Sequence, residues 1–253
     1  MTTTHKRYYG WKRDKEDTRD YPYKASSRVI AALPTSVDLR SNCPPVYDQG
    51  QLGSCTANAI AGAIEFDQIK QGKTPFTPSR LFIYYNERAM EGDVSQDAGA
   101  AIRDGIKSVS KQGCPPESDW PYNIAEFAVQ PPQQAYTDAL LERAVLYQRL
   151  PVNLLTMQAC LASGSPIVFG FEVFSSFESQ QVAQTGIVPM PQRGEQLLGG
   201  HACVLVGYDN SSSSFIFRNS WGLWGDKGYG YMPYHYVANP NLSSDFWTVK
   251  TVS

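Results

Sequence analysis

Apolar residues recur at helical spacing in three stretches of the first half of the chain. They lie three or four positions apart in residues 55–72, 78–92 and 98–113, and each stretch ends at or near a glycine. Such spacing places the apolar side chains on one face of a helix, and glycine readily ends a helix. The pattern predicts three helices, and Ser54 is of the residue type that caps the first of them.

The second half of the chain shows a different pattern. Short apolar runs, typical of strands, are separated by turn-forming residues such as those of 209–214, and they lie at 145–150, 165–173, 201–208, 214–220 and 229–232. A short helix is predicted at 154–164, and the Pro- and Gln-rich segment 129–141 is interpreted as a crossing between the halves. We therefore predict an α+β fold, with a helical lobe at about 50–130 and a β-rich lobe at about 131–253.

Residues 1–33 form a separate arm. They mix charges of both signs with five large rings, a density that a solvated tail has no physical reason to keep; the rings are Tyr8, Tyr9, Trp11, Tyr21 and Tyr23. We expect the arm to pack on the body, which runs from Pro34 to Ser253 as one unit. A loop with two consecutive prolines, Pro44 and Pro45, leads from the arm toward Cys55.

Composition excludes several classes of function. The 253 residues carry 22 basic and 24 acidic side chains, a net charge of −2, so no polycation is present for nucleic acid or anionic lipid. No run of 18 apolar residues exists, and the first 20 residues lack an apolar signal core. We expect a monomer that is cytoplasmic as written, without nucleic-acid or membrane partners, and we leave non-classical export open.

The five cysteines do not form a dense disulfide framework. Their number is odd and they are spread along the chain, at positions 43, 55, 114, 160 and 203. Pairing among Cys43, Cys114 and Cys160 stays open, whereas Cys203, within an apolar run, is interpreted as a buried packing thiol. No CxxC pair or Cys/His cluster suggests zinc, so we expect neither a metal nor another cofactor.

Cys55 is the candidate nucleophile. A cysteine in the first turn of a helix lies where the helix dipole lowers a thiol pKa, and a nearby imidazolium lowers it further. Gln49 lies six residues earlier, across Gly50 and Gly53, so the turn can bring its amide near the thiol as an oxyanion donor beside the Cys55 N–H. Taken alone, Cys55 is more often a packing residue and Gln49 a surface residue.

His201 is the only one of three histidines in a suitable setting. It follows Gly199 and Gly200 and opens an apolar, strand-like run, whereas His5 lies in the charged arm and His235 in a Tyr-rich segment. Asn219 ends the run FIFRN, where its oxygen can accept an imidazole N–H shielded by the indole of Trp221.

Three segments, QGQLGSC, HACVLVGY and NSWGLWGDKGYGYM, resemble in this order the active-site segments of the papain-like cysteine peptidases. The similarity runs from about residue 33 to residue 236. It implies a two-lobed fold with the active site in the cleft between the lobes, and peptide or protein substrates. By position it implies Cys55 as nucleophile, His201 as base and acid, Asn219 as its orienter and Gln49 as oxyanion donor. Residues implied in substrate binding are Gly53, Gly99, Gly200 and Trp221.

The sequence departs from the family pattern at several points. Leu52 replaces a cysteine that forms a disulfide in many relatives, Thr56 replaces a tryptophan, and the run NSWGLWG is one residue shorter than usual beside Trp221. No histidine lies between Cys55 and His201, so the histidine-bearing loop of relatives that trim dipeptides from C-termini is missing, and an endopeptidase is favoured. The resemblance implies an apolar pocket for the P2 residue, with Phe246 and Trp247 as candidates for its floor.

Alternatives remain open at this point. The arm either lies over the cleft and keeps a zymogen latent or only covers an apolar patch, and removal of the residues before Leu33 would separate these readings through activity. The other functions are a non-proteolytic acyl transfer, such as that of a deamidase or transglutaminase, and a papain-like fold used as a binding module.

Overall fold

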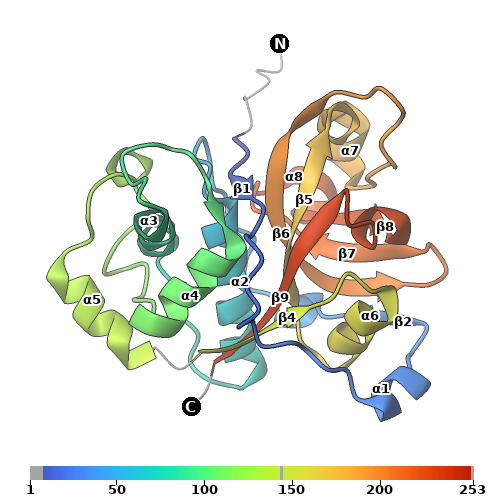
Figure 1. Cartoon of the computed structure of the whole chain (residues 1–253), viewed down its shortest axis with the longest axis horizontal. Coiled ribbons are helices and arrows are strands. Elements are labelled where there is room, and N and C mark those ends of the chain that lie inside the picture. The colour runs from blue at the N-terminus through green and yellow to red at the C-terminus, as the bar shows by residue number, and fades with distance from the viewer. Residues whose placement is uncertain (1–7, 143–144, 252–253) are drawn as a thin grey trace.

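The computed structural model describes residues 8–142 and 145–251. Two lobes lie side by side, one made mostly of helices and the other built around a sheet (Figure 1). The helices are α1 (Ser27–Ala31), α2 (Cys55–Lys70), α3 (Arg80–Glu91), α4 (Ile102–Gln112), α5 (Gln133–Ala139), α6 (Leu154–Ala162), α7 (Gln180–Thr185), α8 (Trp224–Lys227) and α9 (Tyr234–Val237). Within these described ranges, no helix combines the length and apolarity needed to cross a membrane.

The β-rich lobe contains an antiparallel sheet with the strand order β4-β9-β5-β6-β7-β8, and β2 pairs with β6 beside this path. Its strands are β2 (Ser36–Asp38), β4 (Val145–Leu150), β5 (Ile167–Phe174), β6 (Leu197–Asp209), β7 (Ser214–Arg218), β8 (Tyr229–Pro233) and β9 (Ser243–Thr251). Strand β2 precedes the helical lobe in the chain, so a segment from the first half completes the sheet of the second. The predicted α+β class is confirmed.

Helix α2 is buried over almost its whole length. Residues 55–68 are all buried, because the sheet packs on one side of the helix and α3 and α4 on the other. Alternation along the strands supplies the two faces of the sheet: Val168 and Val204 belong to the core around α2, whereas Phe169 and Leu205 belong to a second core on the opposite face. The first residue of α2 therefore has a fixed position against the sheet.

The N-terminal arm follows the junction between the lobes. Strand β1 (Trp11–Lys12) pairs in parallel with β3 (Ala100–Ala101) at the helical lobe, and in Figure 1 it runs down between α4 and β6. Farther along, backbone hydrogen bonds of 2.8 Å join Tyr21 and Tyr23 to Arg149. The expectation that the arm packs on the body is confirmed for residues 8–33, and residues 1–7, with His5, lie outside the described residues.

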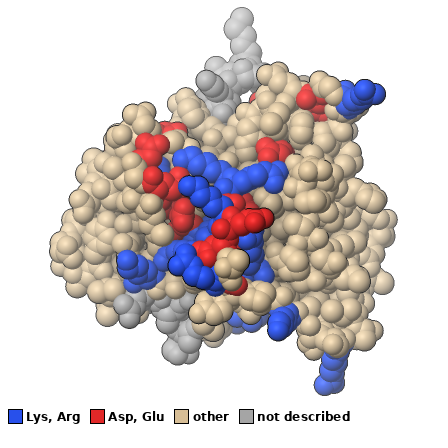
Figure 2. All heavy atoms as spheres, viewed as in Figure 1, with Lys and Arg blue, Asp and Glu red and all other residues tan. Residues whose placement is uncertain are grey.

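Charged side chains gather along the arm. Figure 2 shows lysines, arginines and acidic residues concentrated in the middle of the face along which the arm runs. The arm contributes Lys12 to an ion pair with Glu91 and Arg13 to one with Glu172, each with an N–O distance of 2.8 Å. Its carboxylates Asp17 and Asp20 pair with Lys107, Arg103 and Arg149 of the body. Both lobes are thus bound to the arm by charge.

Two predictions about the elements were wrong in detail, and one strand was missed. Segment 129–141 contains helix α5, because Pro132 provides the N-cap position from which a short helix starts. The helix predicted at 98–113 begins only at Ile102, since Ala100 and Ala101 pair with the arm instead. Strand β9 was not predicted, because Ser243 to Asp245 break its apolar pattern. The predicted strand at 145–150 matches β4.

We expect Phe169→Ala to lower the free energy of unfolding by about 3–5 kcal/mol, as is usual when a buried aromatic ring is removed. Phe169 is fully buried, and its ring stacks on Phe171 and Phe246 at 5.4 and 5.7 Å. Urea unfolding measures the change. The control Leu223→Ala, at a side chain that is 85% exposed, should leave the unfolding midpoint nearly unchanged. An equal effect of the two substitutions would contradict this description of the core.

Candidate active site

Cys55 is the first residue of α2 and is fully buried. Ser54 occupies the predicted capping position, but its hydroxyl contacts Tyr122 and Asn58 and does not cap the helix. Burial raises the pKa of the Cys55 thiol to about 12, although backbone N–H groups of Ala202 and Gly10 hydrogen-bond the sulfur and lower the pKa in part. Cys55 therefore touches β6 on one side and the arm on the other.

His201 lies on β6, one residue before the backbone N–H that contacts Cys55. It is fully buried and pairs with Phe171 of β5, while the pairing of β6 with β7 begins only at Val204. At His201, strand β6 is therefore paired with β5 but not with β7. Its Nε2 donates to Asn219 Oδ1 at 2.8 Å, and the indole of Trp221 stacks on the imidazole with ring centroids 4.6 Å apart.

Asn219 Oδ1 accepts more than one hydrogen bond. Besides His201, the Ser220 backbone N–H donates to it at 2.8 Å and the Cys203 thiol lies 3.6 Å away. These donors fix which end of the amide faces the imidazole, and the imidazole ring is thereby oriented. Cys203 is buried as predicted, but its contact with Asn219 was not foreseen.

Gln49 is held by a second contact that the sequence did not reveal. The Ser220 hydroxyl donates to Gln49 Oε1 at 2.6 Å, which leaves Nε2 as the end that donates within the site. Nε2 reaches two backbone carbonyls, Leu52 O at 2.9 Å and Tyr8 O of the arm at 3.2 Å. The predicted oxyanion donor is thus in contact with arm backbone.

Gly10 of the arm is enclosed by two glycines of the cleft. A Cβ added to Gly10 would lie 1.6 Å from Gly53 O, and one added to Gly99 would lie 2.1 Å from Gly10 O. The Ala100 N–H donates to Gly10 O at 2.7 Å. Only backbone without side chains fits at this point, so Gly53 and Gly99, both predicted to bind substrate, bind the arm.

The arm residues on either side of Gly10 occupy the rest of the cleft. Tyr9 packs against Trp221, with ring centroids 6.1 Å apart, and its hydroxyl donates to Glu178. The Trp11 ring covers Gly200, where an added Cβ would lie 2.6 Å from it. All four predicted substrate-binding residues therefore contact residues 9–11.

The departures from the family pattern have structural consequences. Leu52 is buried in the core around α2, and all five cysteines are free thiols, so Cys43, Cys114 and Cys160 do not pair. Thr56 donates to Glu87 Oε1 at 2.6 Å beneath the start of α2. Glu87 is fully buried, and burial raises its pKa well above the ordinary value.

The two candidates for the floor of the P2 pocket, Phe246 and Trp247, lie in different cores. Trp247 lies in the same core as Trp11, whereas Phe246 belongs to the core on the other face of the sheet, so Phe246 is not part of that floor. The Trp11 indole is hydrogen-bonded by Asp245, whose Oδ2 accepts from Trp11 Nε1 at 3.1 Å. No sequence motif had pointed to this carboxylate.

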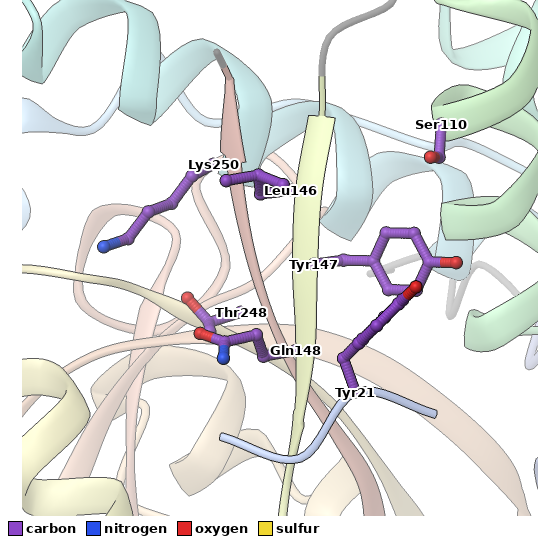
Figure 3. Close-up of a pocket in the computed structure, with 7 residues that line it drawn as sticks. All are labelled: Tyr21, Ser110, Leu146, Tyr147, Gln148, Thr248 and Lys250. Carbon is purple, nitrogen blue, oxygen red and sulfur yellow. The ribbon is translucent and has the colours of Figure 1, made fainter. Parts of the chain in front are cut away.

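One pocket lies away from the predicted catalytic residues. Figure 3 shows a pocket beside β4 and β9 in which Tyr21 of the arm lies next to Tyr147, and none of the four predicted catalytic residues lines it. His235 is exposed on the far side of the β-rich lobe. In residues 8–142 and 145–251, no group of three or more His, Cys, Asp or Glu is arranged to hold a metal ion.

A protein-family model matches most of the chain. The family model described as papain family cysteine protease matches residues 33–245. An uncharacterized peptidase C1-like protein of Acanthamoeba polyphaga mimivirus is 42% identical over the whole chain and 89% of its own length. Cysteine proteinase 3 of Entamoeba histolytica is 26% identical over 79% of the chain, which spans 63% of that relative's length.

Solved structures agree with this assignment. The crystal structure of xylellain, a cysteine protease from Xylella fastidiosa, has a TM-score of 0.92 and 46% identity, and the match covers 97% of this chain and 96% of that one. Digestive procathepsin L 3 of Tenebrio molitor has a TM-score of 0.72 at 22% identity, over 91% of this chain and 73% of that one, and shows the fold alone.

We expect Cys55 to resist alkylation in the folded protein. Its pKa of about 12 leaves little thiolate at pH 8, and the arm blocks access to the sulfur. Peptide mapping after iodoacetamide treatment should show Cys55 reacting at least about tenfold more slowly than the same cysteine in urea-unfolded protein. Equal rates would contradict the buried, arm-covered thiol.

Proposed function

The chain belongs to the papain family of cysteine proteases, and on that premise we propose that it is a cysteine endopeptidase held latent by its N-terminal arm. The observation that carries the proposal is the contact of the arm backbone with the nucleophile and with the oxyanion donor. Gly10 N–H donates to the Cys55 sulfur, and Tyr8 O accepts from Gln49 Nε2. The substrates are peptides or proteins.

Acylation begins at Cys55. Its thiol gives a proton to His201, and the thiolate attacks the carbonyl carbon of the scissile bond. The carbonyl oxygen becomes an oxyanion that Gln49 Nε2 and the Cys55 N–H stabilise, since the first N–H groups of a helix have no partner within it. The imidazolium then protonates the leaving amine while Asn219 keeps the ring oriented, and a thioester remains.

Hydrolysis of the thioester uses the same groups in the reverse roles. His201 accepts a proton from a water molecule, and the resulting hydroxide attacks the thioester carbonyl. The bond to Cys55 breaks, the thiolate recovers the proton, and the peptide acid leaves. Trp221 covers the imidazole and keeps solvent from its hydrogen bond with Asn219.

The direction of the arm supports a blocking role. Because His201 protonates the leaving amine, the C-terminal part of a substrate lies toward His201 and Trp221, and the N-terminal part lies toward Gly99. The arm has the opposite polarity, since Tyr9 contacts Trp221 and the later residues Trp11 and Lys12 pair with β3. It also presents an N–H to the sulfur where a substrate presents a carbonyl carbon. The arm fills the cleft without offering a bond to cut.

Buried charge strengthens this docking. Arg103 and Asp20 form an ion pair whose side chains are only 5% and 7% exposed, and Arg149 reaches the same carboxylate at 3.1 Å. Removal of one partner from such a pair leaves an uncompensated buried charge, which is strongly unfavourable. The pair therefore stabilises the arm in the cleft more than the exposed pairs do.

We expect Gly10→Val in the full-length chain to raise hydrolysis of a fluorogenic Phe-Arg amide by at least about tenfold. A side chain at position 10 collides with the backbone of Gly53, where an added Cβ would lie 1.6 Å from Gly53 O, so the arm loses its place over Cys55. Thr18→Val is the matched control, because Thr18 is an exposed arm residue. Assays under reducing conditions compare both with the unsubstituted chain.

The nucleophile is tested in the same background. Adding Cys55→Ala to Gly10→Val should abolish turnover, since no other group can form the acyl-enzyme. Retained activity would refute Cys55 as the nucleophile, and equal activity of the unsubstituted chain and Gly10→Val would refute latency while leaving the peptidase in place.

We expect Asp20→Asn to activate the enzyme far more than Asp17→Asn. Asp20 faces the buried Arg103, whereas the pair of Asp17 with Lys107 is more exposed, with side chains 15% and 29% accessible. The increase in kcat/KM should exceed about tenfold for Asp20→Asn and stay below about threefold for Asp17→Asn. A larger increase for Asp17→Asn than for Asp20→Asn would show that the more exposed ion pair contributes more than the buried pair to docking of the arm.

A further inference from the structure

The Trp11 side chain fills a pocket that two strands keep free of side chains. Gly170 of β5 faces it, where an added Cβ would lie 2.0 Å from the ring, and Gly200 of β6 lies beneath it. The indole is only 6% exposed, and Trp247 belongs to the same core. Because Trp11 follows Gly10, whose N–H touches Cys55, this pocket lies one residue from the nucleophile.

The wall of this pocket carries a buried carboxylate. Asp245 is 4% exposed, and its Oδ2 accepts two hydrogen bonds from the arm, one from Trp11 Nε1 at 3.1 Å and one from the Asp14 backbone N–H at 2.8 Å. The body holds the carboxylate elsewhere: Arg149 lies 3.6 Å from Oδ1, and the Ser244 side chain also hydrogen-bonds it. When the arm leaves, Oδ2 loses both donors that the arm supplied.

A buried acceptor that loses its donors is unfavourable, so an occupant that restores one gains affinity. Substrate direction places the P2 side chain in this pocket, because the part of the substrate before the scissile bond extends from Cys55 toward Gly99 and β3. An apolar P2 ring fills the volume but leaves Oδ2 without a donor. A ring that carries an N–H at the position of Trp11 Nε1 fills the volume and also donates a hydrogen bond to Oδ2.

Resting on the proposed peptidase function, we propose that Asp245 determines specificity by selecting P2 side chains that are large and donate a hydrogen bond, tryptophan above all. The chemistry is that of the arm itself: the indole contacts Gly170 and Gly200 and its N–H reaches Oδ2. This preference is narrower than the hydrophobic or aromatic P2 that the family resemblance implies.

The test compares substrates that differ by one donor. Fluorogenic amides with Arg at P1 carry tryptophan, 3-benzothienylalanine or phenylalanine at P2; benzothiophene has nearly the shape of indole but no N–H. The enzyme is the full-length chain with Gly10→Val and Trp11→Ala, which keeps the arm attached while removing the side chain that competes for the pocket. We expect kcat/KM for tryptophan to exceed that for benzothienylalanine by about tenfold, as one hydrogen bond to a buried carboxyl oxygen provides.

Asp245→Gly in this background should reduce the ratio to within about twofold, because the acceptor is gone. Glycine suits the site, since Asp245 has a φ of 57°, and Asp245→Asn, which also tolerates this φ and keeps a neutral acceptor, should give an intermediate ratio. Each ratio is taken within one protein, so the folded fraction cancels, and the Asn variant decides the question if the Gly variant does not fold.

The outcomes separate the two proposals. Absence of hydrolysis for all three substrates would overturn the peptidase function. Hydrolysis with equal rates for tryptophan and benzothienylalanine, or a ratio that persists without the Asp245 carboxylate, would overturn only the role of Asp245.

Discussion

The complete burial of helix α2 is the constraint on which the site depends. The helix is enclosed by the sheet on one side and by α3 and α4 on the other, so its first residue cannot move without disturbing the core that surrounds the helix. Cys55 is that first residue, and the backbone next to His201 contacts its sulfur. Under the proposed mechanism, the helical lobe supplies the nucleophile and strand β6 supplies the imidazole, and their mutual position is set by core packing instead of by a flexible loop.

The same arrangement explains why the arm binds through backbone. The cleft is narrow where Gly53 and Gly99 face each other, and the only arm residue that fits between them is Gly10. Backbone groups on both sides need partners, which the arm provides through Gly10 O and through the Tyr8 carbonyl on Gln49. Side chains and ion pairs then add strength on either flank. Under the proposed latency, a docked arm with these contacts competes directly with a peptide substrate.

The extent to which the sequence predicted this structure follows from the range of each signal. Short sequence motifs identified the four candidate catalytic residues, because each motif contains the strand, turn or helix start that positions its residue. The structure brings these residues, Cys55, His201, Asn219 and Gln49, together. Contacts between distant segments gave no such signal: the Ser220 hydroxyl on Gln49 and the Asp245 carboxylate on Trp11 join residues 171 and 234 positions apart. The apolar pattern also failed to predict β9, because Asp245, which contacts the arm, interrupts the apolar pattern of this strand.

Latency and selectivity share one atom under the two proposals. Oδ2 of Asp245 holds the arm through Trp11 and, after release, would hold the P2 side chain of a substrate. A substitution that removes this acceptor therefore weakens both interactions, and it weakens the arm more, because the arm loses the hydrogen bonds from Trp11 Nε1 and from the Asp14 N–H whereas a P2 side chain loses one. The enzyme cannot become more permissive at P2 through Asp245 without also loosening its own arm. A change confined to Gly10 acts differently, because this residue holds the arm between Gly53 and Gly99 and forms no wall of the P2 pocket.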